Sequence, residues 1–152
     1  MLAEHVIPDG VGAGESNPAA KRFRICGPGA IHDATTAAQQ FAGEMGIGPS
    51  DTARLAILVE ELATNLYDHG GLGPDDQFDL EFAATANEIV LTVTDGGTPF
   101  DPASASPRQE IPTRGGGAGL ALVKAWASRT NYEWVAGQNR LTVSLSLRNT
   151  NN

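Results

Sequence analysis

Hydrophobic residues recur with two different periods along the chain, and the changes between these periods mark its predicted elements. Charged and apolar residues alternate over residues 21–26, which is typical of a strand. Apolar side chains then follow one face of a helix over residues 31–45, and again over residues 55–70. A glycine-rich turn separates the two helices, and Ser50 or Asp51 is a suitable N-cap for the second. The first half of the chain therefore predicts one strand followed by two helices.

The second half predicts two β-hairpins with a long loop and one helix between them. Alternation with period two gives strands at residues 77–85 and 88–94 and, after the loop, at residues 132–136 and 140–147. The loop is rich in proline and ends in a run of glycines, after which helical periodicity returns over residues 120–129. A long loop inside a compact domain is commonly functional.

The two ends of the chain lack this periodicity. Residues 1–20 are rich in glycine and proline, so we expect a flexible N-terminal segment, and residues 149–152 are expected to be a polar tail. No internal repeat is visible. The pattern therefore indicates a single domain over residues 21–148.

The composition limits the classes of function. The chain has 152 residues, of which 41% are hydrophobic, and this is enough for one domain with its own core. A net charge of −8 without a basic run argues against a nucleic-acid partner. The single Cys26 cannot form an intramolecular disulfide and cannot by itself make a zinc site. No stretch has the length and apolarity of a membrane span or a secretory signal, so we expect a cytoplasmic protein with no membrane partner.

Two polar residues lie four positions apart beside the apolar stripe of the second helix. Side chains at positions i and i+4 project from the same side of a helix, so Glu61 and Asn65 can reach one ligand. Such a pair is more often a solvated helix edge. Periodicity alone also does not separate Glu61 from the adjacent Glu60.

Two later features suggest how a ligand could be held. Asp95 ends a strand beside two glycines, where its carboxylate could accept a hydrogen bond from an exocyclic amine such as that of adenine, or could simply be a turn residue. The glycine run at residues 115–119 enters a helix, and free backbone N–H groups at a helix start favour an anion such as phosphate. The run matches neither the P-loop nor the dinucleotide pattern, and a flexible linker would look the same.

Taken together and in order, these segments resemble the ATP-binding domain shared by sensor histidine kinases, DNA gyrase, heat-shock chaperones and DNA mismatch-repair proteins. The segments are ELATNLYDHG from Glu61, DGGTPFDP from Asp95, GAGLALVKAWA from Gly117 and GQNRLTVSLSL from Gly137. The first is similar to the family's N-box, the next two to its glycine boxes, and the last to its terminal hairpin. Over residues 21–147 the chain looks most like the free-standing anti-sigma-factor serine/threonine kinases of bacteria.

The resemblance implies a fold and a nucleotide site. The fold would be α+β, a two-layer sandwich of the Bergerat type with a mixed, mostly antiparallel sheet and helices on one face. Asn65 would hold Mg²⁺ through its side-chain oxygen, and Glu61 would be the base that accepts a proton from the attacking hydroxyl. Asp95 would bind the adenine amino group, and Gly97 would let the backbone approach the base.

The remaining implied roles lie in the second half of the chain. Gly117, Gly119 and Leu120 belong to the second glycine box, whose backbone N–H groups would bind the phosphates of ATP. Residues 98–116 would form a lid over the nucleotide. Thr142 is expected to face inward and to support the adenine through water. His69 matches a histidine common in the family, and packing at the helix end is an equal alternative.

The implied activity is that of an ATP-dependent serine/threonine kinase that works by partner switching. It would bind a sigma factor or similar regulatory target and would phosphorylate a small antagonist protein of the STAS type, and such kinases are usually homodimers. One alternative is an ATP-binding interaction module without phosphoryl transfer. A sensor-kinase fragment is less favoured, because His32 stands at the start of a lone helix instead of in a dimerisation hairpin.

Overall fold

The computed structural model describes residues 3–6, 19–68, 70–99 and 116–148. In chain order the elements are β1 (Ala3–Val6), β2 (Ala19–Cys26), α1 (Ala30–Glu44), α2 (Pro49–Asp68), β3 (Gln77–Ala84), β4 (Glu88–Asp95), α3 (Gly116–Trp126), β5 (Ala127–Val135) and β6 (Gln138–Ser146). Every helix and strand that the hydrophobic pattern predicts is present among these elements.

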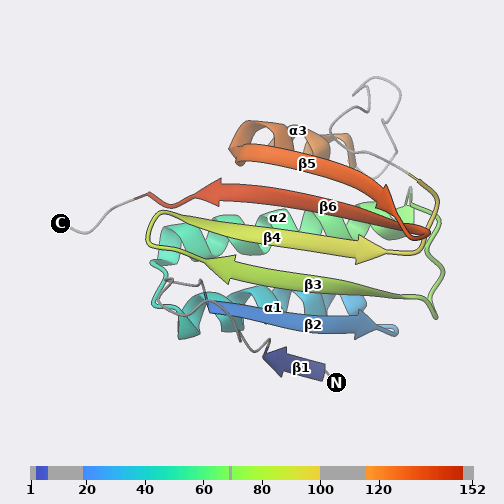
Figure 1. Cartoon of the computed structure of the whole chain (residues 1–152), viewed down its shortest axis with the longest axis horizontal. Coiled ribbons are helices and arrows are strands. Elements are labelled where there is room, and N and C mark those ends of the chain that lie inside the picture. The colour runs from blue at the N-terminus through green and yellow to red at the C-terminus, as the bar shows by residue number, and fades with distance from the viewer. Residues whose placement is uncertain (1–2, 7–18, 69, 100–115, 149–152) are drawn as a thin grey trace.

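The strands form one six-stranded sheet in the order β1-β2-β3-β4-β6-β5 (Figure 1). The resemblance implies a mixed, mostly antiparallel sheet, and all five described pairs of neighbouring strands are antiparallel. The central strand β4 therefore has β3 on one side and β6 on the other. Its C-terminal end lies beside the turn that joins β5 to β6 (Figure 1).

The edge strand β1 is an element that the sequence pattern does not predict. Residues 1–20 are expected to be a flexible segment, whereas Ala3–Val6 forms a short strand paired with residues 21–24 of β2. A strand of four residues is too short to show an alternation that could be recognised, and its hydrogen bonds come from the neighbouring strand. Residues 7–18 of the expected flexible segment and the expected tail at residues 149–152 lie outside the described residues.

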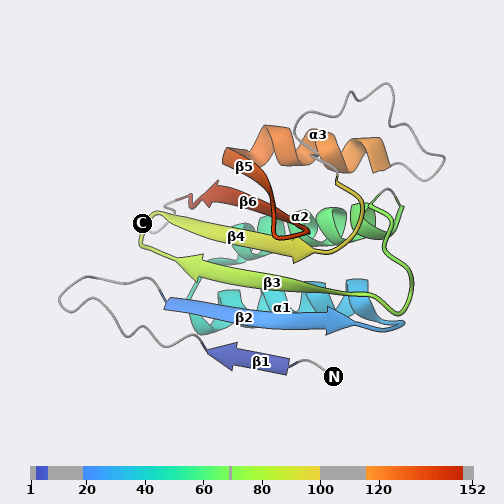
Figure 2. The ribbon, with the colours of Figure 1, turned by 45° about the vertical axis from the view of Figure 1, so that its right-hand side comes forward.

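One face of the sheet carries all three of the described helices. Helices α1 and α2 lie side by side against this face, and α3 packs beside α2 (Figure 2). The strands match this arrangement, because alternate residues of β4 are buried from Ile89 to Asp95 while those between them are partly exposed. The predicted α+β two-layer sandwich with helices on one face is therefore confirmed.

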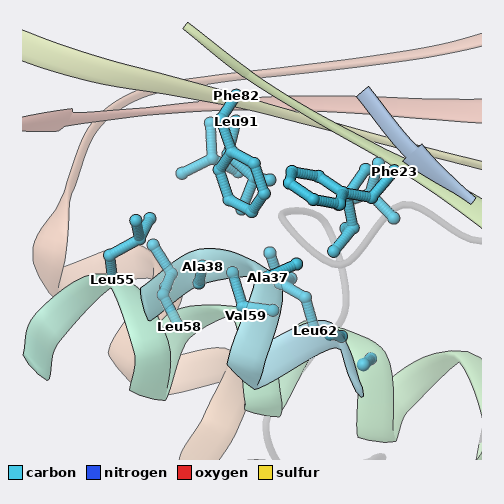
Figure 3. Packing of buried hydrophobic residues seen from close by; sticks show 14 of the residues in the cluster. Phe23, Ala37, Ala38, Leu55, Leu58, Val59, Leu62, Phe82 and Leu91 are labelled. Carbon is cyan, nitrogen blue, oxygen red and sulfur yellow. The ribbon is translucent and has the colours of Figure 1, made fainter. Parts of the chain in front are cut away.

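Aromatic and branched side chains fill the space between the two layers. Phe41 of α1 stacks on Phe82 of β3 with ring centroids 5.2 Å apart, and Phe23 of β2 meets the same ring edge-on at 5.9 Å. Figure 3 shows leucine and valine side chains of α2 pointing toward these sheet residues. Packing of this helix face against the sheet fixes which residues of α2 are buried.

The other face of the sheet carries polar residues that pair across strands. Arg22 lies 3.2 Å from Glu81, and Arg24 lies 3.1 Å from Asp79. These ion pairs are largely exposed, so each contributes little to stability.

The third helix ends earlier than the sequence pattern predicts. The predicted helix spans residues 120–129, whereas α3 starts at Gly116 and ends at Trp126. The residues after it are strand, because Ala127 already pairs with Leu145 of β6. Pairing across the hairpin therefore overrides the helical periodicity of this segment.

The last hairpin also has a shorter turn than predicted. The pattern places a turn at residues 137–139, whereas the strands are joined by Ala136 and Gly137 alone. Both residues have positive φ, 54° and 78°, as a two-residue hairpin of the right twist requires. Strand β6 therefore begins at Gln138, and Asn139 belongs to the sheet.

Candidate functional site

A pocket opens at the end of the sheet where β4 ends, between the sheet and the last turns of α2. Its lining comes from segments that are far apart in the sequence. The lining residues are Leu62, Asn65, Leu66, Gly70, Val93, Asp95, Tyr132, Asn139 and Leu141. Apolar walls with a few convergent polar groups are the usual composition of a small-molecule site.

Asn65 is the buried polar residue on the pocket side of α2. It follows Leu58 and Leu62 at helical spacing, so it lies on the face of α2 that packs against the sheet, and it is only 3% exposed. Neither Oδ1 nor Nδ2 has a hydrogen-bond partner within the described part of the chain. A buried amide without partners costs about 1–3 kcal/mol of folding stability. A ligand that bonded this amide would offset that cost.

Asp95 is the last residue of β4 and is 3% exposed. Its Oδ1 accepts a hydrogen bond from the backbone N–H of Gly97 at 2.8 Å and another from Nδ2 of Asn139 at 3.1 Å. Burial raises the pKa of Asp95 above its ordinary value, although these two hydrogen bonds act in the opposite direction. The carboxyl group is thus fixed through one oxygen, and Oδ2 is the oxygen left for a donor from a ligand.

Gly97 is required by a close approach of two backbone segments. A Cβ at this position would lie 2.1 Å from the carbonyl oxygen of Gly70. That same carbonyl accepts a hydrogen bond of 2.8 Å from the backbone N–H of Thr98. The segment after β4 is therefore tied directly to the segment after α2, which joins the two walls that carry Asp95 and Asn65.

Glu61 lies one helical turn before Asn65 and does not belong to the pocket lining. Its side chain is partly buried, and burial, together with the nearby charge of Glu60, raises the pKa of Glu61 above its ordinary value. Glu60 itself is exposed. The environment therefore distinguishes these two adjacent carboxylates.

The second glycine box lies at the start of α3. Gly117, Gly119 and Leu120 fall in its first turns, so the helix includes the glycine run instead of beginning after it. Figure 2 shows α3 beginning at the end of the sheet where β4 finishes. Most of the expected lid, residues 100–115, and the expected role of His69 lie outside the described residues.

Thr142 does not face the pocket, and the expectation that it points inward is wrong. It lies opposite Thr92 of β4, with the two hydroxyl oxygens 3.5 Å apart. The inward-facing residues of β6 are Asn139, Leu141, Val143 and Leu145, which lie opposite the buried residues of β4. Strand alternation therefore places Thr142 on the outer face of the sheet.

Two pocket residues are missed by sequence reasoning. Asn139 and Tyr132 both line the pocket, and the hydroxyl group of Tyr132 donates a hydrogen bond to Oδ1 of Asn139. Alternation counted from Leu141 and Val143 would have indicated that Asn139 faces inward. The turn predicted at residues 137–139 hid this signal.

The described residues carry neither a cluster of metal ligands nor a membrane span. Within the described ranges, no three or more His, Cys, Asp or Glu side chains gather to hold a metal ion. None of the described helices is long and apolar enough to span a membrane.

The chain is thus an α+β domain, with helices on one face of an antiparallel sheet and a partly apolar pocket at one end of it. A family model described as the histidine kinase-like ATPase domain matches residues 27–145, which is more than three quarters of the chain. The chain therefore belongs to this family, and the resemblance read from its N-box and glycine boxes is confirmed.

A solved structure shows the same fold at low sequence identity. One chain in the crystal structure of the SiaB–SiaC complex from Pseudomonas aeruginosa is 14% identical and has a TM-score of 0.56. The similarity covers 83% of the present chain and 89% of that chain. A comparison with curated protein sequences gave no match.

Proposed function

We propose that this protein binds ATP and acts as a serine/threonine protein kinase of the anti-sigma-factor type. The observation that carries the proposal is the Asn65 amide, which has no partner among the described residues and lines a pocket that also holds the Asp95 carboxylate. Both residues stand at the matching positions of the family's motifs. Because both polar groups are buried beside the pocket, a ligand that forms hydrogen bonds with both would stabilise the protein most.

Asp95 and the loop after β4 would hold the adenine ring. Oδ2 of Asp95 would accept a hydrogen bond from the exocyclic amine, while Leu62, Val93 and Leu141 would give the ring apolar walls. The backbone at the start of α3, from Gly117 to Gly119, would bind the phosphates with N–H groups that have no helical partner.

Asn65 fits one oxygen ligand of a Mg²⁺ ion. Its Oδ1 is buried beside the pocket without a hydrogen-bond partner in the described ranges, and Mg²⁺ prefers oxygen ligands while keeping several waters. The described residues supply no further cluster of acidic ligands, so the other ligands would be water and nucleotide phosphates. When bound, Mg²⁺ would neutralise part of the phosphate charge.

Glu61 would accept the proton of a serine hydroxyl on the protein substrate. The serine oxygen would bond to the terminal phosphorus of ATP, and ADP would leave as the bond to its bridging oxygen breaks. The raised pKa of Glu61 makes it a stronger base than an ordinary carboxylate, which suits proton transfer near neutral pH.

The protein partners are proposed from the same resemblance. We propose that the substrate is a small STAS-type antagonist and that the regulated target is a sigma factor or a similar protein, in the cytoplasm. That the chain similar in fold was crystallised in a complex of two proteins is compatible with a protein partner. Phosphorylation would weaken the antagonist's binding, because a phosphate brings about two negative charges to the contact.

The test is phosphoryl transfer to candidate antagonists. The protein is incubated with Mg²⁺ and ATP and with each small antagonist encoded near its gene, and phosphoserine is located by mass spectrometry. We expect one antagonist to be modified, and Glu61→Gln to abolish the modification while ATP still binds. ATP binding without phosphoserine on any antagonist would overturn the kinase proposal.

One observation favours a second candidate, an ATP-binding interaction module without phosphoryl transfer. Glu61 does not line the pocket, whereas Asn65 and Asp95 do. If partner control survives Glu61→Gln and is lost in Asp95→Asn, nucleotide binding is the function and catalysis is not. Loss of control in both variants would favour the kinase.

A further inference from the structure

A chain of hydrogen bonds runs from the edge of the sheet to the carboxylate in the pocket. The hydroxyl group of Tyr132 on β5 donates to Oδ1 of Asn139 on β6. The other end of that amide, Nδ2, donates to Oδ1 of Asp95 at 3.1 Å. Asn139 is 5% exposed, so little water competes for these bonds.

Asn139 also holds the loop that follows Asp95. Its Nδ2 lies 3.0 Å from the carbonyl oxygen of Thr98 and 3.5 Å from that of Gly97. The N–H group of Gly97 in turn donates to Asp95 at 2.8 Å. One amide group thus contacts both the carboxylate and the backbone segment that fixes its orientation.

We propose that Asn139 and Tyr132 are positioning residues that aim Oδ2 of Asp95 at the ligand and thereby set the preference for a purine that carries an amino group. This inference rests on the proposed ATP site and extends it to two residues to which the resemblance gives no role. Neither residue needs to touch the reacting phosphate. Both act through the direction in which Asp95 presents its free oxygen.

The Tyr132 hydroxyl determines which end of the Asn139 amide faces Asp95. A carboxylate and two backbone carbonyls are acceptors only, so they require the NH₂ end of the amide. Donation by Tyr132 to Oδ1 stabilises this orientation of the amide. Removing the hydroxyl takes away one bond that favours this orientation, and in the reversed orientation the amide oxygen would repel the carboxylate.

ATP and inosine triphosphate separate this role from a general structural one. The two nucleotides have the same sugar and phosphates, but inosine carries an oxygen acceptor where adenine carries an amino donor. A fixed Asp95 gives the amino donor a hydrogen bond and gives the oxygen of inosine none. A change that only misplaces Asp95 lowers the affinity for ATP and leaves that for inosine triphosphate almost unaffected.

The experiment measures both affinities by calorimetry, with Mg²⁺ present, for the wild type and three variants. We expect Asn139→Leu to weaken ATP binding by about tenfold or more and Tyr132→Phe by about threefold to tenfold, which are the losses that follow from one hydrogen bond. Inosine triphosphate should bind within about twofold of wild type in both. Thr142→Val, on the same strand but on the outer face, is the control and should bind both nucleotides as the wild type does.

A second readout does not need a nucleotide. Hydrogen exchange at the Gly97 and Thr98 amides should be roughly tenfold faster in Asn139→Leu, while exchange at Val93 in β4 should not change. Equal losses for the two nucleotides, or no loss for either, would overturn the positioning role. If the wild type bound neither nucleotide, the proposed function would fail, and unchanged exchange at Gly97 and Thr98 would separately overturn the positioning of the loop.

Discussion

The two ends of α2 differ in whether their buried polar side chains have hydrogen-bond partners within the described residues. At the N-terminal end, Oδ1 of Asp51 accepts from Arg54 at 2.7 Å and Oδ2 accepts from the backbone N–H of Arg148 at 2.9 Å. At the C-terminal end, the Asn65 amide has no partner within the described residues. The Asp51 carboxylate is thus paired within the protein and stabilises the fold. The Asn65 amide instead lies beside the pocket, where a ligand can supply its partner.

The paired end is also tied into its surroundings. Arg54 donates to the carbonyl oxygen of Ser146 at 3.3 Å and lies 5.8 Å from the ring centroid of Trp126. Only its Nε lacks a partner among the described residues at this end. These contacts hold the first turns of α2 to the end of β6, at the opposite end of the sheet from the pocket (Figure 1).

The largest change in the free energy of unfolding is expected at the N-terminal end of α2, where the buried charges are paired. Asp51→Ala should lower the free energy of unfolding by about 3 kcal/mol, because it leaves the largely buried Arg54 guanidinium without its charge partner. Urea unfolding at pH 7 measures this loss, and ATP affinity of the folded protein should not change. Asp79→Ala, which removes the exposed pair with Arg24, is the matched control and should cost less than about 1 kcal/mol. Equal losses in the two variants would remove the distinction between buried and exposed pairs.

A change of the opposite sign in the free energy of unfolding is expected at the C-terminal end of α2. Asn65→Leu should raise the free energy of unfolding by about 1 kcal/mol, because it replaces an unsatisfied buried amide by an apolar group of similar size. The same variant should lose ATP binding, as measured by calorimetry. Asn139→Leu is the control, since that amide is paired and its loss should destabilise the fold. A destabilised Asn65→Leu protein that still binds ATP would contradict the account.

A pH dependence of smaller size follows from Glu61. Its pKa is raised in the folded state, so the folded protein holds its proton more tightly than the unfolded chain does. The contribution of Glu61 to the free energy of unfolding is therefore fully present below the unfolded pKa of about 4.3. It is lost as the pH rises through the pKa of the folded state. Glu61→Gln should become more stable relative to wild type as the pH rises from acid to neutral. A stability difference that stays constant between these conditions would show that Glu61 is not held in a desolvated position.

The smallest effect is expected on the outer face. Thr142→Val should change the free energy of unfolding by less than about 0.5 kcal/mol, because the hydroxyl pair with Thr92 is long and partly exposed. ATP affinity should stay within about twofold of wild type. Weaker ATP binding in this variant would restore the inward role that the sequence suggested for Thr142.

The parts of the fold that follow from local periodicity could be predicted from the sequence. Helix α2 shows its buried stripe in the spacing of Leu58 and Leu62, and the same spacing places Asn65 beside them. Asp95 follows Leu91 and Val93 at strand spacing, so its burial is also visible in the sequence. These positions depend on a few neighbouring residues, which periodicity describes well.

The pairing of β6 with its neighbours could not be predicted. The resemblance gave Thr142 an inward role, whereas alternation counted from Leu141 and Val143 places it on the outer face. The register of β6 is set by the two-residue turn at Ala136 and Gly137, whereas the sequence pattern predicts a longer turn. Tyr132 and Asn139 enter the pocket only through that register.

The Asn65 amide has no hydrogen-bond partner in the described part of the chain, and we propose that a bound nucleotide supplies one. The most direct test is the side-chain ¹H–¹⁵N resonance of Asn65, assigned by its loss in Asn65→Leu and followed while ATP is added with Mg²⁺. We predict a large shift at Asn65 and little change at Asn131, which is exposed and bonded to Glu133 on the edge strand. An Asn65 resonance that stays in place after ATP has saturated the protein would contradict the claim.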